Sequence, residues 1–134
     1  KEQRLRKLVT MIHRQAIDPN TKLPHPATRI EAALEEAKFH LNDNKSVEEQ
    51  FDEAISKLRP IIPISIEMRK VEVIIPAQYA GKAYGVVSSN SKMLGDTWNA
   101  DGSWTVKVEL PAGMYPEFLD KLNSLTHGEV VVKE

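Results

Sequence analysis

Apolar and polar residues alternate with a helical period before Pro60 and mostly with a strand period after it. In the first part, apolar side chains recur at i, i+3, i+4 and i+7, the spacing of a helix with one buried face. Three such segments predict helices that end near Ile17, Leu41 and Leu58. Because no short amphipathic helix buries its apolar stripe alone, we expect the three to pack on one another as a small bundle.

The connection between the first two predicted helices, Ile17–Glu31, is strongly constrained. It holds three prolines, two of which flank His25. Each proline fixes its own φ and biases the preceding residue away from the helical region. We therefore expect a stretch of defined shape, needed either for packing or to present a surface, with Pro26 in the first turn of the second helix. We expect His25 to serve structure and not catalysis.

Ser46 and Glu49 have the spacing of a capping box just before the third apolar run. The Ser46 hydroxyl is expected to accept the Glu49 N–H, while the Glu49 carboxylate accepts the Ser46 N–H. Pro60–Pro63 then ends the helix and marks the change of period. We therefore predict two domains, a three-helix domain over residues 1–62 and a second domain over residues 63–134.

Alternating apolar residues predict a strand over Ile64–Ile75. The alternation changes phase at Arg69-Lys70. A bulge explains such a change, and so does a strand whose two ends bury opposite faces. Pro76 ends the strand, and a helical pattern follows to about Ser88.

Two further strand patterns, Lys92–Asn99 and Ser103–Leu110, are joined by Asp101-Gly102, a strong hairpin signal. This hairpin makes Trp98 and Trp104 candidate cross-strand neighbours. A helical pattern and a short apolar strand close the chain. The order β-α-β-β-α-β is the ferredoxin-like arrangement, with two helices on one face of an antiparallel sheet and the other face open. The predicted fold class is α+β, a three-helix bundle domain followed by a ferredoxin-like domain.

Composition excludes several function classes. The chain has no cysteine, which removes disulfides, thiolate catalysis and cysteine-ligated zinc, and fits a reducing compartment. No apolar run approaches the ~20 residues of a membrane helix. With 18 basic and 19 acidic residues, the chain is no general polyanion binder by total charge. Five basic residues crowd the opening helix, so we expect any nucleic-acid contact in the first half, unless they form only a solvated helix face.

No catalytic constellation is present in the sequence. The four histidines are dispersed, and neither a phosphate-binding glycine loop nor a nucleophile elbow occurs. We expect Gly81 and Gly85 to mark a close contact between helix and sheet. An acylphosphatase-like reaction needs an arginine in the loop after the first strand, and Pro76–Gln78 has none. An RNA-recognition domain needs clustered aromatics on its sheet, which the strand at Trp104 lacks. We expect no enzyme, no cofactor and no metal site.

Several short motifs occur in order along the chain: Ile17-Asp18-Pro19, Leu23-Pro24-His25-Pro26, Arg29-Ile30-Glu31-Ala32-Ala33, Leu58-Arg59-Pro60-Ile61-Ile62-Pro63, Ile75-Pro76-Ala77-Gln78-Tyr79, Asp101-Gly102-Ser103-Trp104 and Pro111-Ala112-Gly113. Together they resemble the signature of the Shwachman–Bodian–Diamond syndrome (SBDS) family, most closely its archaeal members. Family proteins have a mixed α/β domain, a central three-helix domain and a C-terminal ferredoxin-like domain. The chain resembles the last two. Because Lys1 is not an initiator methionine, we expect the first to lie upstream.

The resemblance implies a ribosome maturation factor that binds the large ribosomal subunit and its rRNA. It further implies that an elongation-factor-2-type GTPase acts with the protein to release the anti-association factor, initiation factor six. We expect a cytoplasmic monomer that does not bind membranes. The second hypothesis is a protein–protein interaction module without RNA affinity, docking through the open sheet face or the proline-rich stretch.

Four residues match family positions and are implied contacts to rRNA or phosphate: Lys22, His25, Arg29 and Lys45. For Arg29, pairing with Glu31 or helix capping is an equally weighted alternative.

Overall fold

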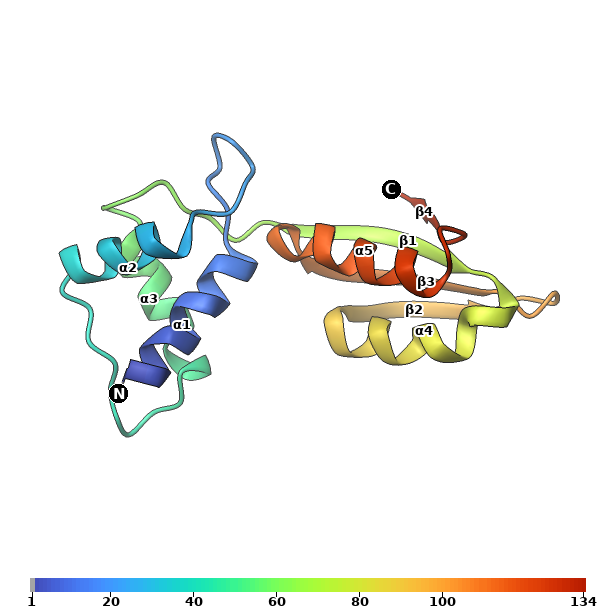
Figure 1. Cartoon of the computed structure of the whole chain (residues 1–134), viewed down its shortest axis with the longest axis horizontal. Coiled ribbons are helices and arrows are strands. Elements are labelled where there is room, and N and C mark those ends of the chain that lie inside the picture. Colours follow the sequence, from blue (N-terminus) through green and yellow to red (C-terminus); the bar gives the residue numbers. More distant parts are fainter. Residues whose placement is uncertain (1) are drawn as a thin grey trace. The chain divides into compact units, whose positions relative to one another are not determined.

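The computed structural model of the protein describes residues 2–134, and the chain divides into two compact units, Lys1–Glu67 and Met68–Glu134. The fold is α+β, with helices in both units and one four-stranded antiparallel sheet in the second (Figure 1). Each unit has its own core of buried apolar side chains. Over residues 2–134, no helix has both the length and the apolar character needed to cross a membrane.

The first unit contains three helices, α1 (Glu2–Gln15), α2 (Ala27–Glu36) and α3 (Phe51–Leu58), the last preceded by a 3₁₀ turn, η1 (Glu48–Gln50). Every pair of these helices is in contact, and their apolar faces close one core. The fully or almost fully buried members include Leu8, Ile12, Ile30, Ala54 and Leu58.

The second helix is shorter than predicted, because α2 ends at Glu36 and not near Leu41. Lys38 adopts a left-handed conformation with φ 56°, and the N–H of Phe39 returns to the carbonyl of Leu34 at 3.0 Å. This hydrogen bond is the one that closes a Schellman-type helix end. Phe39 is still buried, but it reaches the core from an irregular segment. The apolar spacing therefore continues after the helical backbone has stopped.

The capping box forms between Ser46 and Glu49 as predicted, but it opens the 3₁₀ turn η1, and α3 begins only at Phe51. Ser46 Oγ accepts the Glu49 N–H at 3.1 Å, and the Glu49 carboxylate accepts the Ser46 N–H at 3.0 Å. Hydrogen bonds to the carboxylate from the Ser46 backbone N–H, and secondly from the Ser46 side chain, hold the pKa of the Glu49 carboxyl below its usual value. The box thus satisfies two otherwise unpaired backbone donors at the start of the 3₁₀ turn that leads into α3.

The second unit follows the predicted order of elements. Its members are β1 (Met68–Ile75), α4 (Ala77–Asn90), β2 (Lys92–Trp98), β3 (Trp104–Pro111), α5 (Tyr115–Leu125) and β4 (Val131–Lys133). The strands lie in the order β2-β3-β1-β4, and every neighbouring pair is antiparallel. Val71, Val73 and Ile75 point to the face that shares one core with α4 and α5.

The change of phase at Arg69-Lys70 arises because the alternation belongs to two different cores. β1 begins at Met68 and pairs with β3 without a bulge through Ile75, so the strand predicted from Ile64 onward was too long. Ile64 is buried in the core of the first unit, whereas Val71 is buried in the core of the second. Neither a bulge nor a single strand with two buried faces is needed.

The two tryptophans are cross-strand neighbours, as predicted. Trp98 lies directly opposite Trp104, and their rings stack with centroids 5.4 Å apart and an interplanar angle of 19°. Trp104 is fully buried, and its indole N–H donates to the Asp96 carboxylate at 2.7 Å. Trp104 therefore packs in the core and is no base-stacking residue.

The close approach predicted at Gly81 and Gly85 is wrong. A Cβ placed on either residue meets no atom within 4 Å, and both are exposed on α4. The crowded glycine is Gly102 in the hairpin, which has φ +88° and whose Cβ would lie 2.9 Å from that of Ala77. Small side chains such as Ala83, and not the two glycines, face the core from α4.

Gly102→Ala is expected to destabilise the second unit by about 1–3 kcal/mol, because the left-handed backbone and the contact with Ala77 both oppose a side chain. Gly81→Ala is the matched control and is expected to be neutral or stabilising by up to about 1 kcal/mol, since its site is open and helical. Both tryptophans lie in the second unit, so urea unfolding followed by tryptophan fluorescence reports on that unit alone. Equal stability of the two variants would contradict this view of the hairpin.

Glu49→Gln is expected to reduce the loss of first-unit stability in acid. The folded-state pKa of Glu49 lies below the unfolded value of 4.5, so its contribution is present above pH 4.5 and is lost as pH falls through the folded pKa. The amide oxygen of glutamine still accepts the Ser46 N–H but does not titrate. Far-UV circular dichroism during thermal unfolding at pH 6 and below measures the effect. Glu53→Gln removes the same charge from α3 outside the box, and an identical pH profile for both variants would contradict the prediction.

Candidate nucleic-acid interface

The proline-rich stretch is fastened to the segment that follows α3. Ile17 and Ser65 exchange two backbone hydrogen bonds, each 2.9 Å long. The His25 ring donates from Nε2 to the carbonyl of Pro63 at 2.6 Å. These bonds bring together the end of α1, the start of α2 and the segment after α3. We call this region of the first unit the His25 end.

His25 is a structural residue in this arrangement. Its side chain is only 4% exposed, and its own carbonyl accepts a hydrogen bond from Nδ1 of His13 at 2.7 Å. Because a carbonyl only accepts, each imidazole must carry its proton on the bonded nitrogen. Pro26 supports the same junction from the N-cap position of α2, one residue before the first turn in which it was predicted. Burial leaves the His25 ring almost no surface for contact with a phosphate.

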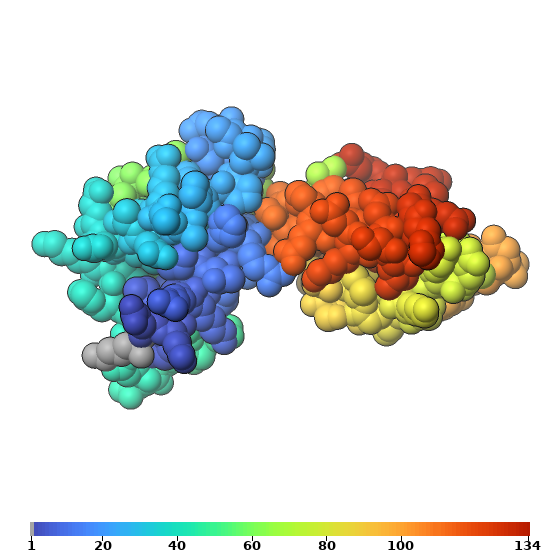
Figure 2. All heavy atoms as spheres, in the orientation of Figure 1, coloured from blue at the N-terminus to red at the C-terminus, as the bar shows by residue number. Residues whose placement is uncertain are grey.

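The loop 18–24 closes on itself. The Asp18 N–H donates to the Leu23 carbonyl at 2.8 Å, and the Lys22 N–H donates to the Asp18 carbonyl at 2.7 Å. Lys22 has φ 65°, and its ammonium group pairs with the Glu67 carboxylate at 2.9 Å while remaining largely exposed. The loop projects from the surface of the first unit (Figure 2). A phosphate near Lys22 would compete with Glu67 for the same ammonium group.

Arg29 presents an exposed cation at the start of α2. It is exposed on the first turn of α2, and its backbone N–H donates to the Pro26 carbonyl at 3.0 Å. Across residues 2–134, its guanidinium has no hydrogen bond or ion pair, and the alternative pair with Glu31 is not formed. A planar guanidinium presented in this way offers bidentate hydrogen bonds to a phosphate.

Lys45 lies in a different loop, which is built around the buried amide of Gln50. The Gln50 side chain is 3% exposed and donates to the carbonyls of Asn42, Lys45 and Ser46, at 3.0–3.2 Å. The guanidinium of Arg4 donates to the Lys45 carbonyl as well. The backbone of Lys45 is therefore held in place while its side chain is exposed.

The structure brings three of the four candidates together and separates the fourth. Arg4 ties Lys45 to the N-terminal end of α1, whereas His13 ties the proline-rich stretch to the C-terminal end. A helix of 14 residues is about 21 Å long at 1.5 Å per residue. Lys45 is thus at the far end of the first unit from Lys22 and Arg29, as the loops in Figure 1 show.

Two basic residues of the opening helix, Arg4 and Lys7, are paired inside the first unit. Arg4 binds the loop at Lys45 and pairs with Asp43 at 3.4 Å, and Lys7 pairs with Glu48 at 2.8 Å. The pair with Lys7 lowers the pKa of the Glu48 carboxyl. The positive charges of Arg4 and Lys7 are therefore partly neutralised within the first unit.

The His25 end carries the positive charge instead. The segments that meet there, residues 16–29 and 57–67, hold four basic residues and two acidic ones. Lys57 and Arg59, at the end of α3, are exposed and belong to this set. Neither residue was predicted from the sequence as a contact. Their position just before Pro60 points to this surface only once the segment after α3 is known to meet the start of α2.

The fold and this surface define a small α+β protein with a helical unit that is basic at one end and a separate sheet unit. Two family descriptions cover almost the entire chain: "SBDS protein, domain II" matches residues 6–67, and "SBDS protein, C-terminal domain" matches residues 69–134. The chain belongs to the SBDS family, which confirms the resemblance drawn from its motifs.

Relatives in archaea and animals align along nearly all of the chain. The ribosome maturation protein SDO1 homolog of Methanothermobacter thermautotrophicus is 44% identical over 124 residues, covering 92% of this chain and 53% of that protein. The Aeropyrum pernix protein of the same name is 36% identical over 132 residues, covering 98% and 57%. The ribosome maturation protein SBDS of Caenorhabditis elegans is 30% identical over 128 residues, covering 95% and 50%. The chain spans about half the length of the curated relatives it matches.

His25→Ala is expected to destabilise the first unit by about 1–3 kcal/mol, because it removes a buried ring together with its hydrogen bond to the Pro63 carbonyl. Far-UV circular dichroism in urea measures the loss. Tryptophan fluorescence, which reports only on the second unit, is expected to show an unchanged midpoint.

His40→Ala is the matched control, since His40 is exposed. A His25→Ala variant as stable as His40→Ala would show that the ring does not hold the proline-rich stretch.

Proposed function

We propose that the protein is a ribosome maturation factor that binds the large ribosomal subunit. The observation that carries this proposal is the alignment of 92% or more of the chain with three relatives named as ribosome maturation proteins. We propose a cytoplasmic, non-enzymatic role in which an elongation-factor-2-type GTPase acts with the protein to release initiation factor six. This finer part rests on what SBDS-family membership implies.

We also propose a specific fold for each of the two units. We propose that the first is a three-helix bundle, supported by the mutual contacts of α1, α2 and α3. We propose that the second is a ferredoxin-like domain, supported by its β-α-β-β-α-β order and its antiparallel sheet. The sequence predicted a boundary between residues 62 and 63, whereas the two compact units divide between Glu67 and Met68.

We propose that the His25 end is the rRNA contact of the first unit. Arg29 supplies an unpaired guanidinium, and Lys22 supplies an exposed ammonium group on a closed loop. Phosphate contacts of this kind position a protein on RNA without reading sequence. His25 acts indirectly, because its bond to Pro63 fixes the loop and the start of α2. Lys45 is proposed as a separate contact at the opposite end of the unit.

The second candidate function is a protein–protein module without RNA affinity. Its apolar contact would be Leu23, which is 63% exposed on the loop 18–24. Neutralising the nearby cations distinguishes the two candidates, because apolar docking does not depend on them.

Arg29→Gln is expected to weaken co-sedimentation of the protein with large ribosomal subunits. The slope of log affinity against log salt is expected to fall in magnitude by about 0.7–1, the value for one lost phosphate contact. Arg6→Gln is the matched control, because Arg6 is also an exposed helical arginine but lies near the N-terminal end of α1.

Absence of co-sedimentation by the unmodified protein at low salt would refute the ribosomal role. Co-sedimentation with an unchanged salt slope in Arg29→Gln would favour the protein–protein candidate at this surface.

A further inference from the structure

The open face of the sheet in the second unit is more basic than the unit as a whole. Residues 68–134 contain seven basic and eight acidic residues. Strand register places four lysines but only two glutamates on the face away from α4 and α5: Lys70, Lys92, Lys107, Lys133, Glu72 and Glu109. The face therefore has a formal charge of +2 in a unit whose total is −1.

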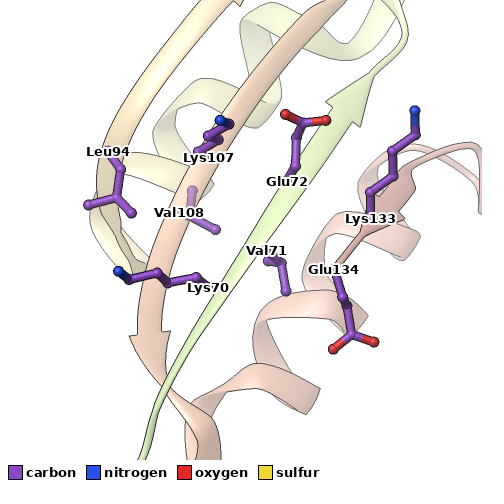
Figure 3. A pocket seen from close by; sticks show the side chains of 8 residues that line it. All are labelled: Lys70, Val71, Glu72, Leu94, Lys107, Val108, Lys133 and Glu134. Atoms are coloured by element: carbon purple, nitrogen blue, oxygen red, sulfur yellow. The ribbon is translucent and has the colours of Figure 1, made fainter.

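Three of these lysines surround a shallow depression. Lys70, Lys107 and Lys133 come from β1, β3 and β4 and line a hollow of about 350 Å³ together with Glu72 and Leu94 (Figure 3). On antiparallel strands, diagonal neighbours such as Lys70 and Lys107 lie about 7–8 Å apart. Residues two strands apart, such as Lys107 and Lys133, lie about 10 Å apart. The lysines thus form a spread row of charge and not a single tight anion site.

The ammonium groups of this row are available. In the part of the chain that the structure describes, none of the three lysines has an ion pair or a side-chain hydrogen bond. The carboxylate at the rim, Glu134, pairs with Arg69, whose guanidinium also lies 3.9 Å from the centre of the Tyr115 ring. Glu72 is the acidic residue within the row and lies opposite both Lys107 and Lys133.

We propose that this face binds the phosphate backbone of RNA, a second RNA contact that rests on the ribosomal role proposed above. The net positive charge of the face favours an anionic partner. Leu94 is the one strongly exposed apolar side chain that lines the hollow, and a single apolar side chain is too small a contact to anchor a peptide. The register places no aromatic residue on this face, because Trp98 and Trp104 lie on the helix side. Binding is therefore through phosphates, without base stacking and without sequence preference.

The test measures binding of a fluorescent oligouridylate of about 12 nucleotides by anisotropy at several salt concentrations. Each phosphate contact with single-stranded RNA contributes about 0.7 to the slope of log affinity against log salt concentration. The variant Lys70→Gln/Lys107→Gln/Lys133→Gln is therefore expected to reduce the magnitude of this slope by about 2. Its affinity at 50 mM salt is expected to fall by roughly tenfold or more. Glu72→Gln is expected to act in the opposite direction and tighten binding, because it removes the acidic group from the row.

Lys82→Gln is the matched control, since Lys82 is exposed on α4 and not on the open face. An unchanged slope in the triple variant, or equal effects of Lys82→Gln and Lys107→Gln, would overturn the proposal. Tighter binding of an oligoglutamate of equal charge than of oligouridylate would overturn it in favour of an acidic protein partner.

Co-sedimentation with large subunits is measured in parallel. Failure of the unmodified protein to co-sediment, with the lysine effects on oligouridylate intact, would reject the ribosomal role and keep this RNA surface.

Discussion

The hydrogen bond from the His25 ring to the Pro63 carbonyl is the constraint on which the first unit depends. It joins residues 38 apart in sequence, and the paired backbone bonds of Ile17 and Ser65 lie beside it. Two prolines restrict the backbone on either side of His25, so little conformational freedom remains to be lost when the ring docks. The start of α2 and the segment after α3 are consequently fixed to the end of α1. His25 thereby shapes the surface proposed to meet RNA.

The same constraint explains where the first unit stops. Ile62 and Ile64 are buried in its core, and Ser65 and Glu67 are bonded to the proline-rich stretch. From Val71 onward, the buried side chains belong to the sheet core. One apolar alternation thus serves two cores in succession.

Ion pairs and strand pairing decide where positive charge is exposed in this protein. Although the formal net charge is −1, two surfaces are basic, the His25 end and the open face of the sheet. Arg4 and Lys7, in the basic opening helix, bind the Lys45 carbonyl and the Glu48 carboxylate within the first unit. Lys107 and Lys133, which are distant in sequence, lie on the same face because strand pairing places both opposite Glu72. Both surfaces are suited to phosphate binding, which requires positive charge but little shape complementarity.

The sequence alone determined what depends on near neighbours. The capping box at Ser46, the hairpin at Gly102 and the order of the elements in the second unit follow from capping, turn chemistry and period, which act over a few residues. The tertiary structure alone decided which apolar residues share a core and which charges meet. It ended α2 at Glu36, because Phe39 reaches the core without a helix, and it separated Lys45 from Arg29. Such outcomes depend on contacts between distant residues, which local spacing does not encode.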